Sequence, residues 1–125
     1  MADYKNLRIW QKAFELSIMI YNMTEQFPPK EKFSLANQME RAAVSIPSNI
    51  AEGYGRGSDR ELYYFLSVAR GSLYELQTQL YIASAIGYTE EEETETLNAL
   101  VNELGRMISA FMRKVEAKNA GLRKR

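Results

Sequence analysis

Apolar residues recur along the chain at spacings of three and four, which is the period of an amphipathic helix. The first apolar stripe consists of Ile9, Ala13, Leu16, Ile20, Met23 and Phe27. The second consists of Ala36, Met39, Ala43, Ile46, Ile50 and Gly53. No segment alternates with period two over a useful length, so the pattern predicts helices and no strands.

Two further stripes follow in the second half of the chain. The third consists of Leu62, Leu66, Ala69, Leu73, Leu76, Leu80 and Ala83. The fourth consists of Leu97, Val101, Leu104, Ile108, Phe111 and Val115. Proline and glycine clusters at 27–29, 53–58 and 87–89 separate the four stripes. Four helices with short connections predict an all-α fold, an antiparallel up-down-up-down four-helix bundle.

Local signals refine the helix ends and the second helix. Ser58 with Glu61, and Thr89 with Glu92, have the spacing of capping boxes that open the third and fourth helices. Pro47 lies inside the second stripe, where it removes a backbone donor and predicts a kink. We expect a kink rather than a break because the apolar spacing continues through Pro47. Residues 1–118 are predicted to form a single bundle domain, and 119–125 a basic flexible tail.

Composition narrows the classes of function. The 125 residues suffice for one domain, and they include no Cys and no His. These absences exclude a disulfide, a thiolate nucleophile, an imidazole base and the usual zinc ligands. A carboxylate enzyme built on Glu52, Glu75 or Glu103 is the opposing hypothesis, but none of them stands in a Glu-x-x-His arrangement. We therefore expect a protein that is not an enzyme and needs no cofactor or metal.

The hydropathy pattern also bears on location. The first residues are polar, and charged residues interrupt the first apolar stretch, which is unlike a signal peptide. The longest uncharged run, 76–89, is too short to cross a bilayer. The sequence thus predicts a soluble cytoplasmic protein with no membrane partner.

The third helix carries more uncharged surface than one bundle covers. Between residues 62 and 88 only Arg70 and Glu75 are charged, so this helix needs a further neighbour, most simply a second copy of the chain. The second helix offers a matching stripe of small and polar residues, for which an ordinary solvated face is the alternative. The predicted subunit interface comprises Arg41, Ser45, Ser48, Glu52, Tyr63, Arg70, Tyr74 and Tyr81.

Two long motifs resemble one protein family. They are the run RAAVSIPSNIAEG at 41–53, followed by Gly55 and Arg56, and the run FLSVARGSLYEL at 65–76. Shorter matches occur at Leu7, 10–13, 27–28, 31–32, 79–80 and 87–88. The chain resembles the four-helix-bundle proteins encoded in intervening sequences of bacterial 23S ribosomal RNA genes, and the resemblance extends to Tyr88.

This resemblance implies a ring-like homopentamer of four-helix subunits with no known catalytic activity. A related branch, the accessory variability proteins of diversity-generating retroelements, acts with a reverse transcriptase and binds nucleic acid. The older label of ribosomal protein reflects where the genes were found, and family membership alone does not define a function.

The charges of the chain cancel in total but separate along the predicted bundle. We call residues 1–12, 52–61 and 112–125 the basic end; they carry 11 basic and 5 acidic side chains. Residues 24–33 and 86–96, the acidic end, carry 2 basic and 7 acidic side chains. A ring would align the basic ends into a surface suited to phosphate, so RNA or DNA is the expected partner, RNA being favoured. The predicted nucleic-acid contacts are Lys5, Arg8, Arg56, Arg60, Arg113, Lys114, Lys118, Arg123, Lys124 and Arg125.

Simpler interpretations stand beside each of these features. Basic residues at the end of the fourth helix also complement its dipole, and a basic tail aids solubility. The glycines at 53–57 are typical of helix termination rather than of a phosphate loop. The tyrosines at 63, 74 and 81 could stack bases, but their spacing is more typical of packing at a helix contact. The carboxylates at 90–95 favour helix capping over a divalent-metal site. A scaffold that docks another protein, such as a polymerase, without touching nucleic acid is the alternative function.

Overall fold

Helices account for nearly all of the chain. The computed structural model describes residues 3–123, with the side chains of residues 3–119, and this part contains no strand. Four long helices follow one another: α1 (Arg8–Thr24), α2 (Leu35–Gly55), α3 (Asp59–Ala85) and α4 (Glu91–Arg123). Two short 3-10 helices, η1 (Tyr4–Asn6) and η2 (Pro29–Glu31), precede α1 and α2. The predicted all-α four-helix bundle is confirmed.

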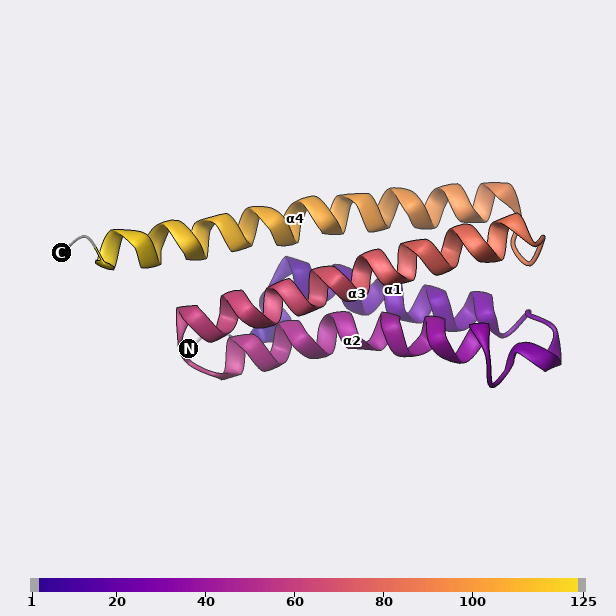
Figure 1. Cartoon of the computed structure of the whole chain (residues 1–125), viewed down its shortest axis with the longest axis horizontal. Coiled ribbons are helices and arrows are strands. Elements are labelled where there is room, and N and C mark those ends of the chain that lie inside the picture. The colour runs from indigo at the N-terminus through magenta and orange to yellow at the C-terminus, as the bar shows by residue number, and fades with distance from the viewer. Residues whose placement is uncertain (1–2, 124–125) are drawn as a thin grey trace.

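The helices run alternately up and down the bundle (Figure 1). Helix α2 packs between α1 and α3, and α4 packs against α3 and α1. Helices α1 and α3 make no close backbone contact, so they occupy opposite corners of the bundle. The α4 helix projects beyond the α2–α3 connection at the end that also holds the N-terminus (Figure 1).

The predicted stripes form the core. All six residues of the first stripe and all six of the second are buried, as are those of the third except the half-buried Leu62. The fourth stripe differs in one position: Met112 is 2% exposed, whereas Phe111 is only partly buried. Burial of these apolar side chains is the main force that holds the bundle together.

Helix α2 continues through Pro47 with only a minor bend. A proline nitrogen cannot donate to the carbonyl four residues earlier, which is that of Ala43. In this bundle the buried Ser17 hydroxyl of α1 lies 2.9 Å from that carbonyl oxygen and 3.0 Å from the Ala13 oxygen. Ser17 can therefore replace the missing donor from a neighbouring helix, which explains why α2 stays helical across the proline.

Of the two predicted capping boxes, the first is formed in part, with Ser58 as the N-cap of α3. The Ser58 hydroxyl accepts a hydrogen bond from the Glu61 amide at 3.2 Å and also lies 3.2 Å from the Glu61 carboxylate. At the second position Thr89 departs from the prediction, because its hydroxyl is bonded to the Thr94 hydroxyl at 2.6 Å and α4 begins at Glu91. Acidic residues still fill the first turn of α4, where they complement the helix dipole.

Glycine has a packing role where α2 approaches α3. A Cβ atom on Gly53 would lie 2.8 Å from the Cβ of Phe65, closer than two such atoms can approach. The two helices therefore meet at the basic end across a backbone surface. In the described part of the chain, no helix combines the length and the hydropathy needed to cross a bilayer.

Candidate nucleic-acid interface

The antiparallel topology gathers the basic end as the sequence predicts. The start of α1, the α2–α3 connection and the last turns of α4 lie at one end of the bundle (Figure 1). The α1–α2 and α3–α4 connections, which carry the acidic residues, lie at the other. The neutral chain is thus polarised along its long axis.

Several of the predicted basic contacts are paired with carboxylates. Lys5 Nζ lies 3.4 Å from Asp3, and Lys118 Nζ lies 3.7 Å from Asp59. Arg56 lies 2.9 Å from Glu52 and 3.7 Å from Glu61, and its guanidinium stands over the Phe65 ring. These ion pairs are exposed, so each stabilises the fold only slightly, yet they reduce the positive field of the basic end.

A second group of predicted contacts keeps its charge available. Arg8, Arg60, Arg113 and Lys114 are exposed, and among the described residues none of them makes an ion pair within 4.0 Å. The side chains of Arg123, Lys124 and Arg125 lie outside the described residues. The backbone of α4 is helical up to Arg123.

A groove that was not predicted from the sequence lies between the middle of α3 and α4. This α3–α4 groove, about 350 Å³ in volume, is lined by Tyr74, Asn102, Gly105, Arg106, Ser109 and Arg113. Sequence reasoning missed Arg106. The signal was present, because Arg106, Ser109 and Arg113 are spaced by three and four and share one face of α4.

The predicted interface residues divide between the surface and internal contacts. Arg41, Ser48 and Glu52 are exposed on α2, and Tyr74 and Tyr81 are exposed on α3. The other three are partly buried within the subunit, and two of them bond inside it. Ser45 Oγ is 2.8 Å from Ser72 Oγ, joining α2 to α3, and Arg70 Nη1 donates to Ser109 Oγ of α4 at 3.3 Å. Tyr63 is half-buried near the start of α3.

Two exposed apolar edges occupy opposite corners of the bundle. The α3 edge consists of Tyr64, Tyr81 and Ile82, which are about half exposed. Tyr74, also half exposed, lies in the α3–α4 groove instead. The α1 edge consists of Phe14, Ile18 and Tyr21, also about half exposed, with the Trp10 ring stacked on Phe14. The α1 edge was missed, although its spacing of four and three was readable beside the core stripe.

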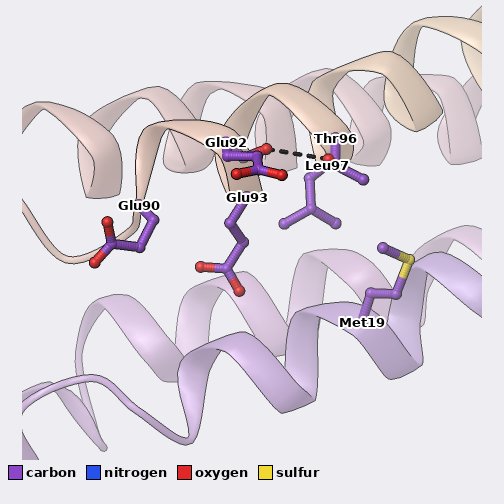
Figure 2. A pocket seen from close by; sticks show the side chains of 6 residues that line it. All are labelled: Met19, Glu90, Glu92, Glu93, Thr96 and Leu97. Carbon is purple, nitrogen blue, oxygen red and sulfur yellow. Dashed lines mark hydrogen bonds between the residues drawn. The ribbon is translucent and has the colours of Figure 1, made fainter.

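The acidic end presents a shallow pocket of about 360 Å³ between α1 and the start of α4. Figure 2 shows the carboxylates of Glu90 and Glu93 pointing in different directions, while Thr96 donates to the Glu92 backbone oxygen. Among the described residues, no group of three or more acidic side chains is arranged to hold a metal ion.

Hydrogen bonds shift the pKa of two glutamates that join elements of the bundle. The Tyr88 hydroxyl donates to Glu31 at 2.7 Å, which lowers the pKa of Glu31 and raises that of Tyr88. The Lys12 ammonium, 3.0 Å from Glu103, lowers the pKa of that carboxyl, with smaller contributions from Arg106 and Arg8. Both glutamates therefore act as anionic acceptors within the fold.

These observations define an all-α four-helix-bundle protein with a polarised surface and two exposed apolar edges. The model of the 23S rRNA-intervening sequence protein family matches residues 5–110, and the chain belongs to this family. A search of curated proteins finds no match.

A solved structure supports the fold. It is that of a protein with unknown function from the S23 ribosomal protein family from Bacteroides thetaiotaomicron. The alignment covers 84% of this chain and 95% of that one, with a TM-score of 0.78 and 22% identity. At this identity the likeness establishes a shared bundle fold and nothing more.

Proposed function

We propose that this chain forms a non-enzymatic, ring-like homopentamer that binds nucleic acid, with RNA favoured, through the basic end of the assembly. The observation that carries the proposal is the axial separation of charge, together with Arg8, Arg60, Arg113 and Lys114. Among the described residues these four side chains make no ion pair, so their charge is largely open to solvent. Repetition around a ring multiplies this charge on one face.

The two apolar edges support assembly of the chain with itself. A closed ring needs two different surfaces on each subunit, one for each neighbour, and they must face in different directions. The α1 edge and the α3 edge meet this requirement because they lie at opposite corners. Contact between the α3 edge of one subunit and the α1 edge of the next would cover apolar side chains that a monomer leaves in water.

Nucleic-acid binding is tested by fluorescence anisotropy with short RNA and DNA oligonucleotides over a range of salt. Binding through phosphate contacts weakens as salt rises, by about 0.7 in logarithmic slope for each contact to a single strand. Replacing Arg8, Arg60 and Lys114 with Gln should weaken binding and reduce the slope. The matched control, Lys30→Gln with Lys32→Gln at the acidic end, should leave both unchanged.

The same experiment separates the proposal from its alternative. Absence of binding at low salt, or binding without a salt slope, would refute a phosphate contact. Purification from the native host adds a second measurement. A stoichiometric protein partner without nuclease-sensitive nucleic acid would favour a docking scaffold instead.

Assembly is tested by native mass measurement with two edge variants. Ile82→Glu disables the α3 edge and Ile18→Glu the α1 edge, so each variant alone should be monomeric. An equimolar mixture should form a dimer, because one intact edge of each kind remains. Phe33→Glu, at an exposed apolar residue outside both edges, should keep the wild-type mass. An unchanged mass in either edge variant would refute that edge as an interface.

A further inference from the structure

The α3–α4 groove has a lining whose charged side chains are all positive. Its charged lining residues are both arginines, Arg106 and Arg113, and no carboxylate lines it among the described residues. Neither arginine makes an ion pair within the part of the chain that the structure describes. The groove is therefore a recess with a positively charged lining, which favours an anionic ligand. Glu103, whose pKa Arg106 helps to lower, offsets part of the Arg106 charge.

The neutral groups of the groove are held in place by bonds across the two helices. Arg70 of α3 donates to the Ser109 hydroxyl at 3.3 Å. Gln77 of α3 donates to the Asn102 side-chain oxygen at 3.1 Å, which leaves the Asn102 amide nitrogen as a donor. Arg70 adds a third positive charge close to the lining residues. These bonds fix the groove wall before any ligand arrives, which lowers the entropic cost of binding.

Gly105 lines the groove and has no side chain, which leaves space there for the Tyr74 side chain. This glycine is buried on α4, and a Cβ atom there would lie 3.6 Å from the Tyr74 hydroxyl oxygen. With only a glycine beneath it, the Tyr74 side chain leans across towards α4 while remaining 50% exposed. The partly exposed Tyr74 ring thus lies beside the two arginines that line the groove.

The spacing of the arginines suits an extended polyanion. Arg106 and Arg113 are seven residues apart, so they lie on the same face of α4 about 10 Å apart along its axis. A guanidinium presents a fork of donors that can bind two phosphate oxygens at once. A ligand that contacts both must carry at least two anionic groups at that separation.

We propose that the α3–α4 groove binds a segment of single-stranded nucleic acid. Arg106 and Arg113 contact phosphates of its backbone, and the Tyr74 ring stacks on an unpaired base. The combination of backbone cations with an exposed aromatic ring favours a single strand, because the bases of a duplex are stacked on one another and withheld from the ring. This inference rests on the proposed function and assigns its principal contacts to the side of the bundle, where Arg113 joins the groove to the basic end.

The test uses the full-length chain and labelled oligouridylate or oligothymidylate, with anisotropy measured at low salt. Arg106→Gln with Arg113→Gln should weaken binding at least tenfold and lower the logarithmic salt slope by about 1.4, the value for two lost contacts. Arg106→Lys keeps the charge but loses the fork, and should weaken binding less. Tyr74→Leu should weaken binding about tenfold while leaving the slope unchanged, since stacking releases no counterions.

Controls distinguish the groove from the basic end and from a subunit contact. The Lys30→Gln and Lys32→Gln variant should bind as the wild type does, and an unlabelled duplex should compete poorly. Equal affinity for oligouridylate and oligothymidylate is expected of backbone and stacking contacts; a preference for the former would add a contact to the ribose hydroxyl. Circular dichroism and native mass should match the wild type for each groove variant.

Three results would overturn the inference. Wild-type affinity in the Arg106→Gln, Arg113→Gln variant, together with weak binding when Arg8, Arg60 and Lys114 are replaced, would leave the proposed function intact and remove the groove from it. A changed native mass in the groove variants would identify the groove as a subunit contact. Absence of oligonucleotide binding by the wild type would refute both the groove and the proposed function.

Discussion

The two ends of the bundle differ in how their charged residues are used. At the acidic end, Glu31 accepts hydrogen bonds from the Tyr88 hydroxyl and from the Leu35 amide, and the Phe27 ring packs on Tyr88. This carboxylate ties the α1–α2 connection to the α3–α4 connection. At the basic end, exposed ion pairs hold part of the charge, while Arg60, Arg113 and others remain unpaired among the described residues. The acidic end thus uses a single carboxylate, Glu31, to join its two connections, whereas the basic end combines surface ion pairs with exposed charges that make no ion pair.

The largest effect is expected from the aromatic contact at the acidic end. Phe27 is 7% exposed, so Phe27→Ala should remove buried apolar surface and lower the free energy of unfolding by about 3 kcal/mol. Urea unfolding at a fixed protein concentration measures this change. Phe33→Ala is the control, because Phe33 is 85% exposed and its loss should change stability by less than about 0.5 kcal/mol. Equal losses in the two variants would contradict the closed packing of this end.

An intermediate effect is expected where α2 meets α3 at the basic end. Gly53→Ala places a methyl group 2.8 Å from the Phe65 Cβ, so the helices must separate, at a cost of about 1–3 kcal/mol. Gly55→Ala is matched to it, because a Cβ there has no neighbour within 4 Å. Thermal unfolding of the two variants should differ clearly. Indistinguishable midpoints would show that the close approach at Gly53 carries no constraint.

The smallest effect concerns the pH dependence of the Glu31–Tyr88 bond. The Tyr88 hydroxyl holds the pKa of Glu31 below its ordinary 4.5, so the stabilisation is complete above that pH and is lost as acid protonates the folded carboxylate. Glu31 in turn raises the pKa of Tyr88 above its ordinary 10.0, so stabilisation is complete below that pH and is lost as alkali ionises the folded phenol.

Tyr88→Phe should therefore lower stability between about pH 4.5 and 10 and flatten both limbs of the stability profile. Urea unfolding at a series of pH values provides the profile. Glu103→Gln, which removes a different shifted carboxyl, should alter the acid limb and spare the alkaline one. A Tyr88→Phe profile parallel to that of the wild type would contradict the coupling.

The fold could be predicted from the sequence because the sequence patterns that indicate it are local. The apolar spacing of each helix, the breaker residues and the Ser58 cap each depend on neighbours within a few positions. The candidate site was readable only in outline. The polarity of the two ends follows from topology, but the pairing of Arg56 with Glu61 and of Lys118 with Asp59 depends on which side chains converge from different helices.

The same reason explains the contacts that sequence reasoning did not find. Arg106 has no special local context, and its place beside Tyr74 depends on the groove that α3 and α4 form together. Thr89 had the spacing of a cap, but in the folded chain its hydroxyl is bonded to that of Thr94, from the first turn of α4. Periodicity therefore predicts which face of a helix is buried, but it does not predict which side chains make contacts between neighbouring helices.

The bond between Ser17 and the carbonyl of Ala43 also fixes the register of α1 against α2. If α1 slid by one helical turn, Ala13, Phe14 or Ile20 would face that carbonyl, and none of them carries a hydroxyl group. The phenol of Tyr21 is the other candidate, but a ring separates its hydroxyl from the backbone. Each slipped arrangement would leave a buried carbonyl without a donor, which costs about 1–3 kcal/mol. Because Pro47 leaves the Ala43 carbonyl without its helical donor, the bundle favours the one alignment of α1 and α2 in which Ser17 reaches that carbonyl.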